Sequence, residues 1–323
     1  MALVRLDVEA LPVNTVLLFD AYVFVDWCAA KAPKTGKDSI WIASGCWIQG
    51  HFELVTLSNP PTRDEATREV ANLLRQHTQA NQRVLIGFDF NYGYPTGVAR
   101  ALGIQEPQPW RGVWQYLSAR VHDGPDNMNN RFEVAAEINR RLCPPTYGPF
   151  WGAPKNLALP NLAATKPTYP YPVGETSLAQ CRVVDCHLRA KGKQPKSVWQ
   201  LFYRGAVGSQ ALTGIPRLEQ LRNDPALSPH SRVWPFETGW DALLSGRRPL
   251  VLHAEIWPGA FSMENELHSV KDAAQVLHLV KLCASRDQQD RLDEVFKRPA
   301  CLTTEEDHQV RNEEGWIIMP PEE

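Results

Sequence analysis

Long apolar stretches are missing from this chain of 323 residues. No uninterrupted apolar run approaches the roughly 20 residues that cross a bilayer, and the first residues lack the basic start and apolar core of a secretion signal. Paired cysteines are missing too. The seven cysteines are scattered and show no CxxC spacing, which disfavours a disulfide framework or a zinc site. We therefore expect a cytoplasmic protein with reduced thiols and no membrane association.

An excess of charge of one sign is also absent. The formal net charge is −2, and hydrophobic and charged residues make up 43% and 22% of the chain, as in ordinary soluble domains. This balance excludes a globally basic nucleic-acid binder and leaves local basic segments open. The length is sufficient for one large domain or two ordinary ones.

Regular structure is easiest to predict in the first hundred residues. Runs rich in β-branched and aromatic residues predict three consecutive strands, with a turn at Gly45 between the second and third. A capping-box pattern at Thr62 and Glu65 then precedes apolar residues at helical spacing, which predicts a helix over 62–79. A nearly all-apolar run follows, typical of a strand covered on both faces. The expected strands are 20–27, 38–45, 46–57 and 83–90.

Prolines concentrate in the middle of the chain, between Pro107 and Pro172. Because proline interrupts both helix and sheet, we expect an insertion with helices near 110–121 and 129–142 and a long irregular segment. Trp110 and Trp114 share one helical face and either cover a site or dock on the main domain. The expected parts of the chain are 12–104, the first part of the core; 105–178, a Pro-rich insertion or lid; 179–300, the second part of the core; and 301–323, a C-terminal tail.

Regular structure resumes after the insertion. We expect a strand at 181–188, a short helix around 197–203, a strand at 249–257 and a helix from about 269 to 286. Three strands, a helix and a strand, followed later by a strand and a helix, is the element order of ribonuclease H-like proteins. The predicted fold is therefore α/β, with a ribonuclease H-like mixed sheet flanked by helices and a Pro-rich insertion.

Two aspartates, Asp26 and Asp89, end apolar runs that look like buried strands. A right-handed crossover would place these strands side by side and parallel, so that both carboxylates lie at the edge where α/β sheets hold their sites. Glu255 ends a later strand and Asp272 opens the last long helix. Close carboxylates repel each other unless a cation intervenes, and Mg²⁺ or Mn²⁺ prefers oxygen ligands. The alternative is that each residue caps a turn or favours a helix dipole.

Four segments carry a resemblance: "FVDWCAAKAPKTGKDSIWIA", "LIGFDFNYGYP", "HAEIWPGAF" and "VKDAAQVLHLV". In this order they resemble the signature segments of an uncharacterised family of predicted RNase H-like nucleases, the domain-of-unknown-function 429 group. The resemblance implies that Asp26, Asp89, Glu255 and Asp272 bind metal and are catalytic. Resolvase-type members of the superfamily have a second helical carboxylate where this chain has Gln275, which argues against a resolvase-like two-metal arrangement.

The segment 181–204 is rich in basic residues, and the aromatic residues Trp199, Phe202 and Tyr203 lie near its end. Basic side chains interleaved with aromatics suit a phosphate backbone and stacked bases; the alternative is a solvated loop beside an ordinary helix. Small residues at 204–214 match no nucleotide-binding loop and indicate tight packing or a turn. The candidate substrate-binding residues are Arg189, Lys191, Lys193, Lys196 and Arg204.

Two further side chains lie near the predicted acidic site. His253 points to the same strand face as Glu255 and is either a metal ligand or proton carrier or, more commonly for such a residue, a buried structural histidine. Cys28 follows Asp26 closely, but no Cys/His/Asp order supports a nucleophile there.

These patterns favour a metal-dependent phosphodiesterase or nuclease acting on a nucleic acid or nucleotide, with Mg²⁺ or Mn²⁺ as cofactor. One alternative is a small-molecule phosphotransferase, although "DWCAAK" lacks the phosphate turn of such enzymes. The other is a non-catalytic protein of the same fold that binds a ligand or a protein partner.

Overall fold

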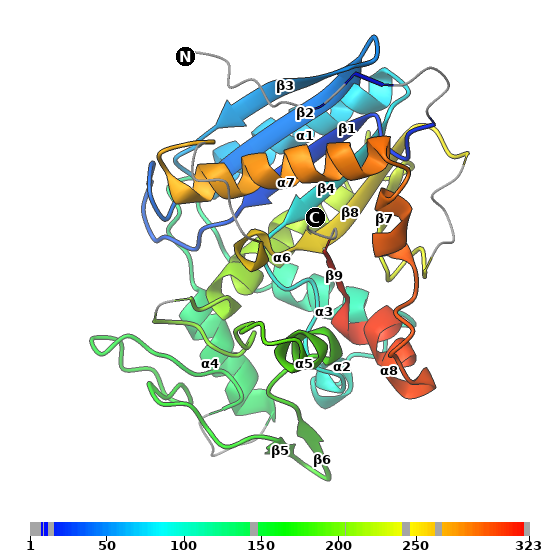
Figure 1. Cartoon of the computed structure of the whole chain (residues 1–323). Helices are drawn as coiled ribbons and strands as arrows, with labels where there is room; N and C mark the ends of the chain where they lie inside the picture. Colours follow the sequence, from blue (N-terminus) through cyan, green and yellow to red (C-terminus); the bar gives the residue numbers. More distant parts are fainter. Residues whose placement is uncertain are drawn as a thin grey trace.

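The structure is a computed structural model that describes residues 8, 10–11, 16–142, 148–203, 205–240, 246–261 and 267–319. A mixed β-sheet forms the upper part of the molecule in the view of Figure 1, with helices on both of its faces. In the described part of the chain, no helix is both long and apolar enough to span a membrane.

The sheet is antiparallel at one side and parallel at the other. Its strand order is β3-β2-β1-β4-β8-β7, and β9 also pairs with β8. The first three strands are antiparallel to one another, whereas β4 runs parallel to β1 and β8 runs parallel to β4. The strands are β1 Ala21–Asp26, β2 Trp41–Ile48, β3 His51–Ser58, β4 Arg83–Phe88, β7 Ser231–Val233, β8 Leu250–Ile256 and β9 Ile317–Ile318. The predicted α/β class, with a mixed sheet flanked by helices, is confirmed.

The turn between β2 and β3 corrects one prediction. It falls at Gln49 and Gly50, both of which have positive φ, and not at Gly45. Gly45 lies inside β2, where a Cβ atom would come 2.4 Å from the Phe52 ring. Its lack of a side chain therefore serves close packing within the sheet and not a turn.

Helices α1 (Arg63–Gln79) and α7 (Lys271–Gln288) match their predicted positions. Thr62 caps α1 by accepting a hydrogen bond from the Glu65 backbone N–H at 3.2 Å. The two helices lie on opposite faces of the sheet, and α7 crosses β1 and β2 (Figure 1). Alternate residues of each strand therefore enter two separate apolar layers, one shared with α1 and one with α7.

The central insertion contains both helices expected there, α3 (Pro109–Ser118) and α4 (Arg131–Leu142). Trp114 is fully buried and donates a hydrogen bond to the Tyr92 carbonyl oxygen at 2.6 Å, while Trp110 stacks on Phe236. The insertion thus packs against the sheet domain through its tryptophans. Its other elements are β5 (Tyr171–Val173) and β6 (Thr176–Leu178), and the short helix α2 (Val98–Ala101) precedes it.

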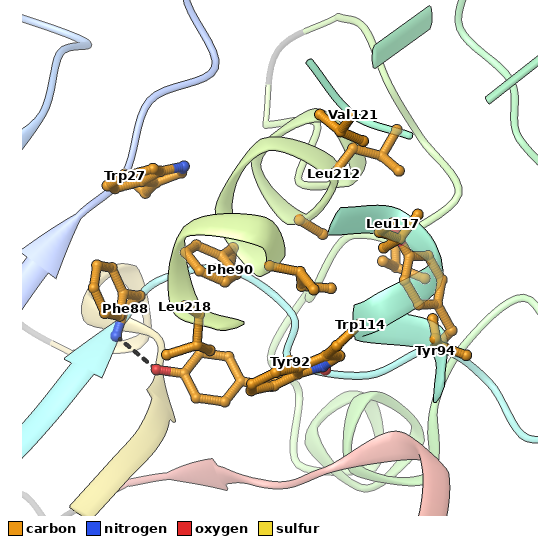
Figure 2. Close-up of a cluster of buried hydrophobic side chains, with 14 of the residues drawn as sticks. Trp27, Phe88, Phe90, Tyr92, Tyr94, Trp114, Leu117, Val121, Leu212 and Leu218 are labelled. Carbon is orange, nitrogen blue, oxygen red and sulfur yellow. Dashed lines mark hydrogen bonds between the residues drawn. The ribbon is translucent and has the colours of Figure 1, made fainter. Parts of the chain in front are cut away.

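Aromatic side chains lead from the end of β4 into this insertion. Figure 2 shows Phe88, Phe90 and Tyr92 in succession, with Trp27 above the first and Trp114 beside the last. The Tyr92 hydroxyl accepts a hydrogen bond from the Phe88 backbone N–H at 3.3 Å. The described part of the insertion therefore shares one apolar core with β1 and β4; its role as a lid stays a prediction.

Two predictions for the second half are wrong. Residues 181–188 do not form a strand, because α5 (Val183–Ala190) occupies most of them. Its start is fixed by Asp185, whose side chain accepts from the Arg182 backbone N–H. The segment 197–203 is not a helix. It forms a turn, closed by a hydrogen bond from the Gln200 N–H to the Ser197 carbonyl. It then pairs with Trp151, whose N–H donates to the Trp199 carbonyl and whose carbonyl accepts from the Leu201 N–H.

Several elements were not predicted. Helix α6 (Gly208–Arg222) covers the small-residue segment, and the expected tight packing is present, since a Cβ at Gly214 would lie 2.3 Å from the Phe90 ring. The described part of the C-terminal tail, 301–319, is also structured. It contains α8 (Thr304–Gln309), a π-helix η3 (Val310–Glu314) and β9, and short 3₁₀ turns η1 (Pro258–Ala260) and η2 (Leu292–Phe296) precede it.

Candidate active site

The structure brings Asp26 and Asp89 together. Val25 pairs with Phe88 across the parallel strands β1 and β4, so Asp26 ends β1 beside the point where Asp89 follows β4. The Asp89 N–H donates to the Val25 carbonyl at 3.3 Å, and Asp89 Oδ1 accepts from the Trp27 N–H at 2.6 Å. The crossover rule applied to the sequence therefore predicted this juxtaposition correctly.

The loop after β1 is held in place by buried contacts. Trp27 is buried and packs edge-on against Phe88. Arg63, at the start of α1, donates to the carbonyl oxygens of Cys28 at 3.0 Å and Ala30 at 2.8 Å. These contacts fix the backbone immediately after Asp26 and so limit how far its carboxyl group can move.

Burial and mutual repulsion perturb both aspartates. Burial, followed by the charge of Asp89, raises the pKa of Asp26 well above its ordinary value. Burial also raises the pKa of Asp89 to about 7, opposed by the hydrogen bonds from Trp27 and Asp26. The two carboxyl groups hydrogen-bond to each other. Without a cation, ionisation of one carboxyl group therefore disfavours ionisation of the other, and the pair retains a proton to higher pH than an exposed aspartate does.

Asp272 is the third acidic group at this point. It lies in the first turn of α7, and its Oδ2 accepts from the Asp38 backbone N–H at 2.6 Å. Burial raises the pKa of Asp272, whereas the Asp38 backbone hydrogen bond and, more weakly, the charges of Lys271 and Lys34 lower it. Its charge in turn raises the pKa of Asp26 and of Asp89, so the three groups act on one another electrostatically.

Glu255 is in a different chemical situation. It lies near the carboxyl end of β8, paired with Phe88 of β4, but both of its carboxylate oxygens contact Arg182 at 2.7 Å. Oε2 also accepts from the Tyr92 N–H at 2.9 Å. The charge of Glu255 is therefore neutralised inside the protein by a bidentate ion pair.

A metal site made of four carboxylates is not assembled, because Glu255 faces Arg182. Among the described residues, no group of three or more His, Cys, Asp or Glu side chains is placed to hold a metal ion. Asp26 and Asp89 remain as a pair of close oxygen donors. Such a pair fits Mg²⁺, which commonly binds through one or two carboxylates and keeps several waters.

A small cavity of about 40 Å³ connects the two acidic regions. It has room for a few water molecules. Asp89, Asn91 and Glu255 line it, together with Asp185 and Lys196. One member of the predicted basic segment, Lys196, therefore borders the candidate site directly.

The other basic residues are dispersed. Lys193 Nζ donates to the carbonyl of Ala260, just beyond the end of β8, which places it at the same edge of the sheet. Arg189 donates to the Pro195 carbonyl at 3.1 Å, and Lys191 lines a separate cavity. Arg204 lies outside the described residues. The segment is thus no continuous phosphate-binding surface in the described part of the chain.

Sequence reasoning missed the role of Arg182, which is fully buried. Besides Glu255 it contacts Asp185 through Nη2 at 3.2 Å and the Glu314 carbonyl at 3.0 Å. The only local signal was the three-residue spacing of Arg182 and Asp185 at a helix start. The partnership with Glu255 joins residues far apart in the sequence, and no local pattern indicates it.

The two remaining candidate residues, His253 and Cys28, have structural contacts and, among the described residues, no contact that indicates catalysis. His253 is fully buried, its Nε2 lies 3.3 Å from Ser231 Oγ, and burial lowers its pKa to about 3, so it is neutral. Burial raises the pKa of the Cys28 thiol, whose Sγ donates to the Asp38 carbonyl at 3.2 Å. Neither feature activates a nucleophile.

Comparisons with protein-family models, with curated proteins and with solved structures found no match to this chain.

Proposed function

We propose that this chain is a metal-dependent phosphodiesterase of ribonuclease H-like architecture that acts on a nucleic acid or nucleotide. The observation that carries the proposal is the pair formed by Asp26 and Asp89. Both lie at the carboxyl ends of adjacent parallel strands, and both pKa values are raised without a basic partner among their causes. Two buried acids that must share a proton provide a site for a divalent cation.

Each residue has a distinct part in this proposal. Asp26 and Asp89 hold Mg²⁺ or Mn²⁺, and Asp272 contributes negative charge from α7. A bound cation would polarise a phosphoryl oxygen and stabilise the charge that develops on it. Lys196, which lines the cavity beside Asp89, attracts the phosphate group. Glu255, predicted as a ligand, is assigned here to the ion pair with Arg182 that holds the end of β8.

The element order supports the architecture. Three antiparallel strands, helix α1 and the parallel strand β4 are followed later by β8 and α7, the order expected of ribonuclease H-like proteins. The resemblance of the four segments to the domain-of-unknown-function 429 group is consistent with it and stays a prediction.

One observation favours a second candidate, a non-catalytic binding protein of the same fold. The described residues hold no cluster of three metal-binding side chains, and the Asp26–Asp89 pair can be stable as a protonated carboxyl pair. In that case the cavity at Asp89 takes a small ligand or a protein partner and no metal chemistry occurs.

Replacing Asp89 with Asn separates the two candidates. We expect millimolar Mn²⁺ to raise the melting temperature of the wild type by several degrees and that of Asp89→Asn hardly at all, because the variant lacks one anionic ligand. Phosphodiesterase activity on single-stranded DNA, RNA and bis-p-nitrophenyl phosphate should fall by about 10²-fold or more in the variant.

The matched control is Asp20→Asn. Asp20 precedes β1 at the opposite end of that strand and pairs with Arg248 at 2.7 Å, so its loss should lower stability equally with and without Mn²⁺. A wild type that gains no thermal stability from Mn²⁺, with an Asp89→Asn variant that melts several degrees lower, would sink the metal-site proposal and leave the binding protein.

A further inference from the structure

Three side chains from separate segments meet at a second place, away from the acidic site. His187 lies on α5, Cys301 precedes α8, and Glu306 lies on α8. Cys301 Sγ is 3.6 Å from His187 Nδ1, and His187 Nε2 is 3.4 Å from Glu306 Oε1. A nucleophile within reach of a base, with the base oriented by a third group, is the arrangement of an activated thiol.

The carboxylate of this group is held in place. Glu306 Oε2 accepts from the Thr303 backbone N–H at 2.9 Å and from Thr303 Oγ1 at 3.1 Å, which leaves Oε1 toward His187. The Thr303 backbone hydrogen bond also lowers the pKa of Glu306, so the carboxylate is charged. The capping box of α8 therefore fixes the group that faces the histidine.

One tautomer of His187 suits the thiol. With the proton on Nε2, Nδ1 is left as an acceptor for the thiol proton of Cys301, while Nε2 lies near the Glu306 carboxylate without forming a hydrogen bond to it. The imidazole also packs against Trp316, with 5.8 Å between ring centroids. The contact with Trp316 thus restrains the ring, and the Glu306 carboxylate acts on it through its negative charge.

A cavity of about 290 Å³ opens beside the thiol. Cys301 and His187 line it, and Cys301 is accessible to solvent. The other walls combine apolar side chains with the charged side chains Lys191, Glu294, Lys297 and Arg298. The apolar lining consists of Val184, Leu188, Val295, Pro299, Trp316, Ile317 and Met319. Its volume suits a short carbon chain next to the sulfur.

We propose that Cys301 is the nucleophile of a second site, which transfers a short apolar acyl group from an ester to water. Cys301 Sγ attacks the carbonyl carbon while His187 Nδ1 takes the thiol proton. The ester C–O bond then breaks, the leaving alcohol oxygen takes this proton, and a thioester on Cys301 remains. Water attacks the thioester, His187 takes a proton from the water, and the sulfur recovers it as the carboxylic acid leaves.

The test uses p-nitrophenyl acetate with the full-length chain in a metal chelator, so that the acidic site does not contribute. Peptide mass spectrometry locates the acetyl group, and release of p-nitrophenol gives the rate. Cys186 is the internal control, because it is an exposed thiol next to His187 in the sequence, whereas the contact with the His187 ring nitrogen is made by Cys301. We expect acetylation of Cys301 well ahead of Cys186.

Variants of the other two residues complete the test. His187→Ala should slow acetylation by about 10²-fold, and added imidazole should restore hydrolysis of the thioester. Glu306→Gln keeps the capping box, in which Gln can replace Glu, but removes the negative charge. Its acetylation rate should therefore lie between those of the wild type and His187→Ala. The matched control Glu305→Gln, one residue away on α8, should match the wild type.

Equal acetylation of Cys186 and Cys301, or a His187→Ala variant as fast as the wild type, would overturn the proposal. So would a Cys301→Ser variant that releases p-nitrophenol at the wild-type rate. Melting curves of all variants establish that each one is folded.

Discussion

Two clusters of acidic residues lie at the carboxyl edge of the same sheet, and their charges are balanced in different ways. Glu255 and Asp185 receive a buried arginine, Arg182, which contacts both at 2.7 and 3.2 Å. Asp26 and Asp89 lie next to each other, and the pKa values of both are raised. At neighbouring strand ends, the charge of Glu255 is therefore neutralised by an arginine of the same chain. The charges of Asp26 and Asp89 have no such partner among the described residues and favour binding of a proton or a cation.

This difference separates a structural site from a chemical one. An internal ion pair with both carboxylate oxygens occupied has no free ligand to offer. A carboxyl pair that shares a proton exchanges it readily for a divalent ion, because the ion removes the repulsion. We therefore infer that Glu255 stabilises the fold at the end of β8, and that the Asp26–Asp89 pair takes part in the proposed reaction.

Removal of Arg182 should have the largest effect. Arg182→Met leaves Glu255 and Asp185 buried without their cation, so we expect a loss of roughly 3–5 kcal/mol in the free energy of unfolding. Urea denaturation measures it. Arg189→Met, an exposed position on the same helix, should change stability by about 1 kcal/mol or less. A similar small change in both variants would mean that the ion pair does not hold the end of β8.

The pH dependence of stability should reveal the other pair. The pKa of Asp89 is about 7 in the folded protein, against an ordinary value near ~4 when unfolded. The folded state therefore binds more protons between these values, and the free energy of unfolding should fall as pH rises from about 4 to about 7, by roughly 2–4 kcal/mol. Asp26, whose pKa is raised further, extends the decline to higher pH.

Asp89→Asn is the reference for this measurement. Asp287, whose pKa burial raises to about 6, titrates in the same range, so the difference between the wild type and the variant isolates the pair. We expect a smaller decline in Asp89→Asn, and a smaller one in the wild type with saturating Mn²⁺. If the free energy of unfolding of the wild type and of the variant depended on pH in the same way, the pKa of Asp89 would not be raised in the folded protein.

Asp272→Asn should have the smallest effect on stability. The change relieves repulsion with Asp26 and Asp89 but weakens the acceptor for the Asp38 N–H, so the net change should be within about 1 kcal/mol. The Mn²⁺ concentration that gives half of the thermal shift should nevertheless rise several-fold, as a Mn²⁺ titration of melting temperature can measure. If the Mn²⁺ concentration at half of the thermal shift did not change, Asp272 would not contribute to cation binding.

Local patterns predicted the parts of the fold that have a clear period or cap. Helix α1 has the Thr62 cap and an apolar face, and β4 and β8 are short apolar runs between breaks. These features depend on neighbours in the sequence. The segment around Val184 and Leu188 was misread because a short apolar pattern suits a strand or a helix. The small-residue segment around Gly214 was not recognised as helix α6, because its glycines and Pro216 weaken the local helix signal.

By itself, the sequence determined the α/β class, the positions of α1 and α7, and the closeness of Asp26 and Asp89. The last of these follows from a general rule for parallel crossovers and needs no side-chain detail. Only the tertiary structure decided that Glu255 pairs with Arg182 and that Cys301, His187 and Glu306 meet. These contacts join residues from distant segments, and their geometry depends on how helices pack against the sheet, which no local period in the sequence encodes.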